Sequence, residues 1–180
     1  WSPFFQTWDL AGAYPAILTD KVVGEAAMKV FNEAQAMLKK IIDGRWLSAS
    51  GVIALMPANS ANDVDIEVYT DESRSEVAFT WFGMRQQTVK PVIDGVPRPN
   101  QCLSDFVAPK GTDDYIGLFA VSAGMGMEKR LAQFEAAHDD YSAIMFKSLA
   151  DRLAEAFAEY MHERVRTDLW GYAAGEHLDA

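Results

Sequence analysis

Apolar residues recur with the period of an α-helix across the last third of the sequence, and this pattern constrains the fold more than any other. The spacing predicts one long helix that begins after Asp139 or Asp140 and runs to about Leu169. Either aspartate can cap it, because a carboxylate accepts hydrogen bonds from the free N–H groups of a first helical turn. The apolar stripe consists of Tyr141, Met145, Leu149, Leu153, Phe157, Tyr160 and Val165. A stripe this long must be buried against other elements, so the helix forms one layer of the fold.

A second amphipathic helix is predicted nearer the N-terminus. Thr19 and Asp20 can cap its first turn, and Gly44 can end it as a C-cap. Apolar residues follow the helical period between these ends: Val23, Ala27, Val30, Phe31, Ala34, Leu38, Ile41 and Ile42. A short helix is also expected over residues 128–137. Residues 1–15 are rich in aromatic side chains but show no clear period, so we interpret them as a packed, irregular segment.

The middle of the chain contains short apolar runs that are typical of β-strands. Val64, Ile66 and Val68 alternate with two acidic residues, which predicts a half-exposed strand. Further strands are predicted over residues 52–56, 77–82, 102–107 and 115–121, with turns at 57–62 and 71–73 and a loop at 89–100. The order of helix, sheet and long helix indicates an α+β fold, in which an antiparallel sheet of four or five strands is flanked by long helices.

The chain is strongly acidic, with 26 acidic against 16 basic side chains and a net charge of −10. This balance disfavours binding to nucleic acid or to an anionic membrane, because both need basic residues. The one cysteine, Cys102, excludes an internal disulfide and any multi-cysteine zinc or iron–sulfur site. A single thiol fits a reducing, cytoplasmic location, and no run approaches the roughly 18 apolar residues of a membrane-spanning helix.

Motifs for catalysis or metal binding are incomplete. His162 and Glu163 begin like the helix of a zinc protease, but Arg166 stands where the second histidine is required. Gly124 and Gly126 lack the third glycine of a dinucleotide-binding loop. Histidines without cysteine neighbours are expected to be structural or exposed, and this applies to His138, His162 and His177. The sequence therefore predicts no catalytic residue and no metal ligand in this chain.

Acidic residues recur every four positions on the predicted long helix: Asp151, Glu155, Glu159 and Glu163. Like charges at this spacing repel one another weakly, so the row needs an explanation. One interpretation is a solvated acidic face, and the other is a carboxylate row that receives a cationic ligand or partner. The spacing alone does not decide between them.

The same helix carries a resemblance to a known family. Residues 137–141, 148–160 and 162–166 strongly resemble the C-terminal activation domain of cobalamin-dependent methionine synthase. Further matching blocks run in order along the chain: residues 1–5, Trp8, 11–12, 14–15, 85–87, 103–110, 114–117 and 170–172. On these blocks the chain is identified as a member of this family.

The resemblance implies a role in a modular cytoplasmic methyltransferase. That enzyme moves a methyl group from methyltetrahydrofolate to homocysteine through cobalamin, and its zinc, folate and cobalamin sites lie in other modules. The activation domain binds S-adenosylmethionine and supports the reductive methylation of inactive cob(II)alamin, with an electron from flavodoxin or a flavoprotein reductase. The implied fold is a curved α+β domain built on a twisted antiparallel sheet.

Two site residues follow from the resemblance. Glu155 matches a family glutamate near the amino group of S-adenosylmethionine, and charge-assisted hydrogen bonds to a carboxylate suit that ammonium group. Asp151, one turn earlier, matches an aspartate implicated in contacts with the cobalamin module.

Other parts of the family's ligand site fall outside the sequence. In the family, an aspartate precedes the residue that matches Trp1, and an Arg-Pro-Ala-Pro-Gly-Tyr-Pro loop follows the long helix. Residues 1–180 are therefore expected to be a single, partial activation domain from a longer protein, without its C-terminal ligand loop. The isolated fragment is expected to be inactive.

Two functions stay open at this point. The first is the reactivation module of the methyltransferase, and the second is a non-catalytic surface that docks the cobalamin module and an electron-donor flavoprotein. Flavodoxins are usually acidic, so their docking would need a basic patch, for which the candidates are Lys129, Arg130, Arg164 and Arg166. Salt would separate the two functions, because contacts between exposed charges weaken with ionic strength more than a buried ligand site does.

Overall fold

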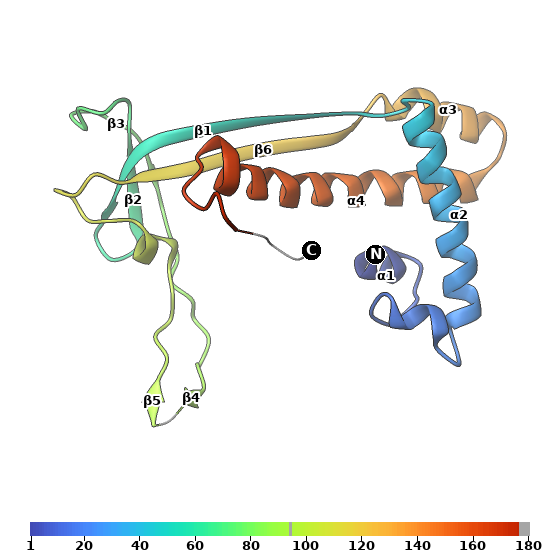
Figure 1. Cartoon of the computed structure of the whole chain (residues 1–180), viewed down its shortest axis with the longest axis horizontal. Helices are drawn as coiled ribbons and strands as arrows, with labels where there is room; N and C mark the ends of the chain where they lie inside the picture. The colour runs from blue at the N-terminus through green and yellow to red at the C-terminus, as the bar shows by residue number, and fades with distance from the viewer. Residues whose placement is uncertain (94, 177–180) are drawn as a thin grey trace. The chain divides into compact units, whose positions relative to one another are not determined.

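Figure 1 shows the computed structural model of the chain, which describes residues 1–93 and 95–176. The helical elements are α1 (Ser2–Thr7), η1 (Ala16–Thr19), α2 (Gly24–Asp43), η2 (Leu103–Phe106), α3 (Met127–Ala136), α4 (Asp140–Arg164) and η3 (Val165–Leu169). The strands are β1 (Ser48–Ala61), β2 (Asp65–Tyr69), β3 (Val77–Trp81), β4 (Val92–Ile93), β5 (Val96–Pro97) and β6 (Tyr115–Met125). The chain forms two compact units, which we call the first unit (1–52 with 120–180) and the second unit (53–119).

Helices α1, α2 and α4 enclose the core of the first unit. Phe4, Phe5 and Phe146 are buried there with the apolar stripe of α2. The irregular structure predicted for residues 1–15 is wrong for α1. Pro3 lies in its first turn, where a proline ring is tolerated, and the burial of two phenylalanines stabilises a helix too short to show a period.

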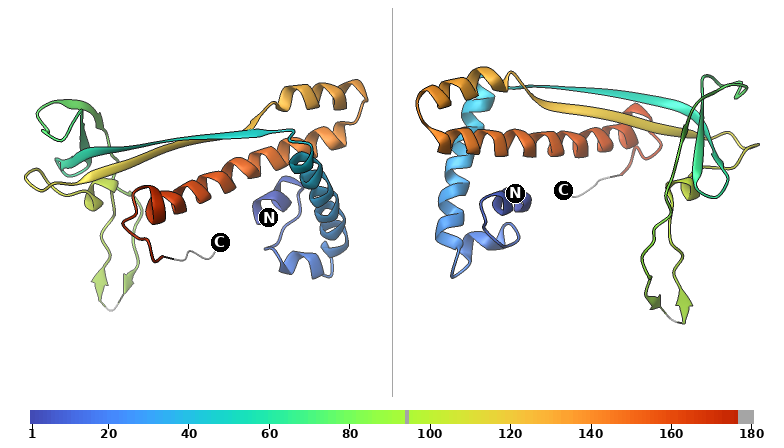
Figure 2. Two further views of the ribbon diagram at one scale, coloured as in Figure 1. Left: turned by 45° about the horizontal axis from the view of Figure 1, so that its top comes forward. Right: turned by 180° about the vertical axis from the view of Figure 1, so that it is seen from behind.

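The long C-terminal helix confirms the sequence prediction at both ends. Asp139 is its N-cap, and the Asp139 Oδ1 atom accepts a hydrogen bond from the Ser142 N–H at 3.0 Å. A π-helical turn, η3, then extends the helix to Leu169. Both views in Figure 2 show the predicted short helix, α3, turning back beside the N-terminal part of α4. No helix in the described ranges combines the length and apolar character needed to cross a bilayer.

Helix α2 matches the prediction at its C-terminus and begins later than expected. Gly44 is the C-cap, as predicted. The Asp20 Oδ1 atom accepts hydrogen bonds from the N–H groups of Val22 and Val23, at 2.7 and 3.0 Å. Asp20 therefore stabilises the turn that precedes α2, and Val23 occupies the N-cap position.

The main sheet has four strands in the order β3-β2-β1-β6. The pairs β1–β2 and β2–β3 are antiparallel, with Ile66 opposite Ser60 on one side and Trp81 on the other. Strand β1 passes from the first unit to the second and β6 passes back, so these neighbours also run in opposite directions (Figure 1). The turn predicted at 57–62 is wrong, because β1 continues to Ala61 and buries the polar residue Asn59.

Helix α4 packs directly on the part of β1 that belongs to the first unit. A Cβ atom added to Gly51 would lie 2.6 Å from Cε of Met161 and 3.2 Å from Cζ of Phe157. The α4 side chains thus occupy the space that a side chain at position 51 would need. The predicted α+β fold, with an antiparallel sheet flanked by long helices, is confirmed.

The strand predicted at 102–107 is wrong, because this segment forms the 3-10 turn η2. The Asp105 carboxylate accepts a hydrogen bond from the Cys102 N–H at 2.9 Å and two from the Arg85 guanidinium at 2.7 and 2.8 Å. These hydrogen bonds hold the pKa of Asp105 at about 2 and favour the turn over an extended chain. Inside the predicted loop 89–100, β4 and β5 form a small antiparallel pair.

Gly83 is a position in the second unit where only glycine fits. A Cβ atom there would lie 2.0 Å from the Val64 carbonyl oxygen and 3.1 Å from the Cys102 Sγ atom. We expect Gly83→Ala to lower the free energy of unfolding by about 1–3 kcal/mol, because the backbone must move to admit a methyl group. Urea denaturation measures this change. Gly175→Ala is the matched control, since a Cβ there meets no atom within 4 Å, and equal costs at both positions would contradict the expectation.

Candidate functional site

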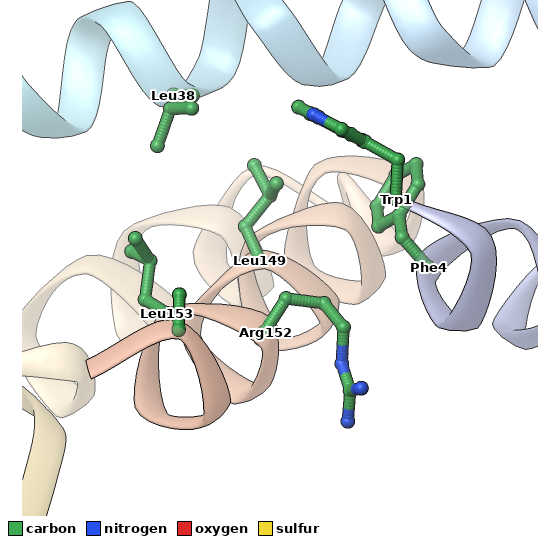
Figure 3. A pocket seen from close by; sticks show the side chains of 7 residues that line it. Trp1, Phe4, Leu38, Leu149, Arg152 and Leu153 are labelled. Carbon is green, nitrogen blue, oxygen red and sulfur yellow. The ribbon is translucent and has the colours of Figure 1, made fainter. Parts of the chain in front are cut away.

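A cavity of about 300 Å³ lies in the first unit between α1, α2 and α4 (Figure 3). Its lining residues are Trp1, Phe4, Leu38, Leu149, Arg152, Leu153 and Ala156. The two aromatic side chains come from the start of the chain, Leu38 comes from α2, and the others come from α4. This volume is at the lower end of the range for small-molecule sites in proteins.

Arg152 is the one charged residue in this lining. Its guanidinium points away from Leu38 and Leu149 (Figure 3) and pairs with the neighbouring Asp151 carboxylate, with Nε 3.1 Å from Oδ2. The Asp151 side chain is 66% exposed, so water screens the pair and it adds little to stability. The methylene groups of Arg152 therefore contribute apolar surface to the cavity while its charge is balanced outside.

A second hollow, of about 430 Å³, continues along the same side of α4. Leu153 and Ala156 line both spaces, and residues from the end of α2 and from β1 and β6 complete the second. Ile42 and Tyr160 line it and are 64% and 51% exposed. We call the two spaces together the α4 groove. Its walls are mostly apolar, so it can bury the apolar part of a ligand or partner.

The predicted site residues Glu155 and Asp151 lie on α4 but do not line the α4 groove. Each is two residues from Leu153, and a helix turns about 100° per residue, so both project from the opposite side of α4. Both side chains are exposed. Within residues 1–93 and 95–176, the Glu155 carboxylate has no hydrogen-bond or ion-pair partner. It is therefore free to accept hydrogen bonds from a cationic group.

The structure does not bring the four candidate basic residues into one patch. Lys129 and Arg130 lie on α3, which folds beside the N-terminal part of α4, whereas Arg164 is the last residue of α4. Arg164 pairs with Asp168, and Arg166 pairs with Glu176, with Nε 2.6 Å from Oε2. The charges at the C-terminal end of α4 are therefore locally balanced.

Two of the three histidines lie in the described part of the chain. His138 is in the turn between α3 and α4, and His162 is exposed on α4, whereas His177 is outside the described residues. Among the described residues, no group of three or more histidine, cysteine, aspartate or glutamate side chains could hold a metal ion.

The sequence analysis did not predict the α4 groove. Residues that line it, such as Phe4, Leu38 and Leu153, are apolar residues of the kind that form a hydrophobic core, and nothing in the sequence distinguishes them from core residues. No local pattern indicates that three facing helices leave space between them. In the first cavity, Trp1 and Arg152 carry side chains whose size or charge could have suggested a binding surface.

Fold and site together define a helix-flanked α+β module with an apolar groove and an exposed carboxylate row, a class suited to binding a ligand or partner. Residues 1–180 match the family described as the vitamin B12 dependent methionine synthase, activation domain, and the chain belongs to this family. The family resemblance identified in the sequence is thus confirmed.

A crystal structure described as the MetH reactivation domain bound to AdoHcy is similar to this chain, with 53% sequence identity and a TM-score of 0.87. The match covers 99% of this chain and 54% of that chain. The present chain thus spans about half the length of that protein.

Proposed function

We propose that this chain is part of the reactivation module of a cobalamin-dependent methionine synthase and that the module uses S-adenosylmethionine. The observation that supports this proposal most strongly is the similarity, at 53% identity, to a reactivation domain that binds AdoHcy. AdoHcy is what remains of S-adenosylmethionine after its methyl group has been transferred. The family match extends over both units, which favours treating residues 1–180 as part of one activation domain.

In this proposal the chain supplies binding and orientation. Cobalamin would be held by another module of the parent enzyme, where it would supply the methyl-accepting chemistry. The residues of this chain would hold the donor, so that its sulfonium methyl faces that module. Zinc, like cobalamin, would belong to other modules, and the parent enzyme would work as a cytoplasmic methyltransferase.

Glu155 is proposed to bind the amino group of S-adenosylmethionine. Its carboxylate is exposed and has no partner among the described residues, so binding would not require an existing ion pair to break. Asp151 lies one helical turn before Glu155 on the same face of α4, and it is proposed to contact the cobalamin module. The Arg152 guanidinium beside it would leave that contact with little net charge.

We expect Glu155→Gln to weaken S-adenosylmethionine binding roughly tenfold or more, because a hydrogen bond to a charged group contributes about 1.5–3 kcal/mol. Isothermal titration calorimetry on the full-length parent enzyme and on the 180-residue chain measures the change. Glu159→Gln is the matched control, since it removes the same charge one turn further along α4. Unchanged binding by Glu155→Gln, or an equal loss in both variants, would contradict the proposed role.

A second candidate function is docking of the cobalamin module and of an electron-donor flavoprotein. It is favoured by the α4 groove, whose residues Ile42 and Tyr160 expose apolar surface. Such docking would be independent of S-adenosylmethionine. If the acidic row on α4 makes the contact, affinity for the isolated cobalamin module should fall steeply between low and moderate salt. Salt-independent affinity would exclude the row as the contact.

A further inference from the structure

A small polar pocket of about 170 Å³ lies in the first unit, where α2 ends and α3 begins. It is lined by Gly44, Arg45, Trp46, Gly126, Lys129 and Arg130. Half of these residues are cationic, in a chain whose net charge is −10. The pocket is separate from the α4 groove, with which it shares only Arg45.

Among residues 1–93 and 95–176, the three cations of this pocket form no ion pair with a carboxylate. Seven basic side chains of the described residues form ion pairs, but Arg45, Lys129 and Arg130 are not among them. The nearest acidic residues in sequence are Asp43, which pairs with Lys39 at 2.6 Å, and Glu128 in the first turn of α3. Unpaired like charges around one small space repel each other, and an anion between them would remove that repulsion.

Arg130 is held in place before any ligand binds. Its guanidinium carbon lies 3.9 Å from the centre of the Trp46 ring, and its Nη1 atom donates to Gln133 Oε1 at 2.7 Å. The Trp46 ring is itself fixed against Gly44, because a Cβ there would lie 2.2 Å from the Trp46 Nε1 atom. A guanidinium that is already oriented loses little side-chain entropy when it binds an oxyanion.

We propose that Arg45, Lys129 and Arg130 form a binding site for a phosphate group. A guanidinium presents N–H donors in a planar fork that matches the oxygen atoms of phosphate, and the lysine adds a compact positive charge. The pocket is smaller than the usual site for a drug-sized molecule, so it would hold the phosphate group itself and leave the rest of a phosphorylated molecule outside. S-adenosylmethionine has no phosphate group, so this site is separate from the one proposed for that ligand.

The test measures phosphate binding to the 180-residue chain in low-salt buffer. We expect inorganic phosphate to shift the Nε–H NMR signals of Arg45 and Arg130, and Lys129→Gln to raise the dissociation constant roughly tenfold, as loss of one charge-assisted contact predicts. Lys29→Gln is the matched control, because Lys29 is exposed on α2 and forms no described ion pair. Adenosine monophosphate, titrated in parallel, distinguishes free phosphate from a phosphorylated molecule by which of the two binds more tightly.

Two results would overturn the proposal. One is the absence of any phosphate-induced shift in the wild-type chain, and the other is an equal loss of affinity in Lys129→Gln and Lys29→Gln. Lys129 is exposed and makes no described hydrogen bond, so Lys129→Gln should fold normally. A loss of phosphate affinity in this variant can then be assigned to the missing charge.

Discussion

Replacing Phe146 with alanine is expected to lower the free energy of unfolding by about 3–5 kcal/mol. Phe146 is completely buried on α4, and its ring contacts those of Trp46 and Phe134 edge-on, with both centroid distances at 6.0 Å. The substitution would remove these ring contacts and leave a cavity in the first unit that the surrounding helices cannot fully close. Urea denaturation followed by tryptophan fluorescence measures the change.

Phe82→Ala is the matched control for this prediction. It removes the same atoms, but the Phe82 side chain is 82% exposed, so its loss should cost less than about 0.5 kcal/mol. A cost for Phe146→Ala as small as that of the control would mean that α4 does not pack in the first unit as the structure shows.

Replacing Asn59 with leucine is expected to cost about 3 kcal/mol or more in the second unit. Asn59 is 1% exposed, and its Nδ2 atom donates to the carbonyl oxygens of Ala108, Pro109 and Thr112 at 3.1, 3.1 and 2.7 Å. Its Oδ1 atom accepts a hydrogen bond from Arg74 Nη1 at 3.2 Å. Leucine can form none of these four hydrogen bonds, so each of the polar groups that now pair with Asn59 would lose one hydrogen bond.

Hydrogen exchange of the β2 amides measures this loss where it occurs, because β2 pairs with β1 in the second unit. The control is Asn32→Leu, since Asn32 is exposed on α2 in the first unit. We expect faster exchange in β2 for Asn59→Leu alone. Protection that is equally strong in both variants would show that the Asn59 hydrogen bonds do not stabilise the second unit.

The two long helices, α2 and α4, were predicted well because their signals are local. The N-cap at Asp139, the C-cap at Gly44 and the apolar period between such ends all lie within one segment, and the structure confirms them. Strand boundaries were predicted less well. Polar residues at 57–62 suggested a turn, but the Asn59 side chain donates hydrogen bonds to carbonyl groups some 50 positions later in the chain, so β1 can continue through this segment. No short stretch of sequence contains both the donor and these acceptors.

In the candidate site, too, the sequence identified the features that lie within one segment and did not identify those that several segments form together. The carboxylates Asp151 and Glu155 were identified on one exposed side of a helix from spacing and family resemblance, and their proposed ligands are still predictions. The α4 groove was not identified, because it is the space left between residues of α1, α2, α4 and the sheet. The small polar pocket proposed to bind phosphate was not identified either, because Arg45 is far in the sequence from Lys129 and Arg130.

The sequence by itself determined the helices α2, α3 and α4, the α+β class, the acidic row and the family of this protein, since periodicity, capping and motif blocks are properties of neighbouring residues. Only the tertiary structure decided how far β1 extends, that residues 103–106 form a turn, and that Lys129 and Arg130 are separated from Arg164. It also decided where empty space and unpaired charge occur. These depend on how side chains from distant segments fit together, and local sequence does not encode that fit.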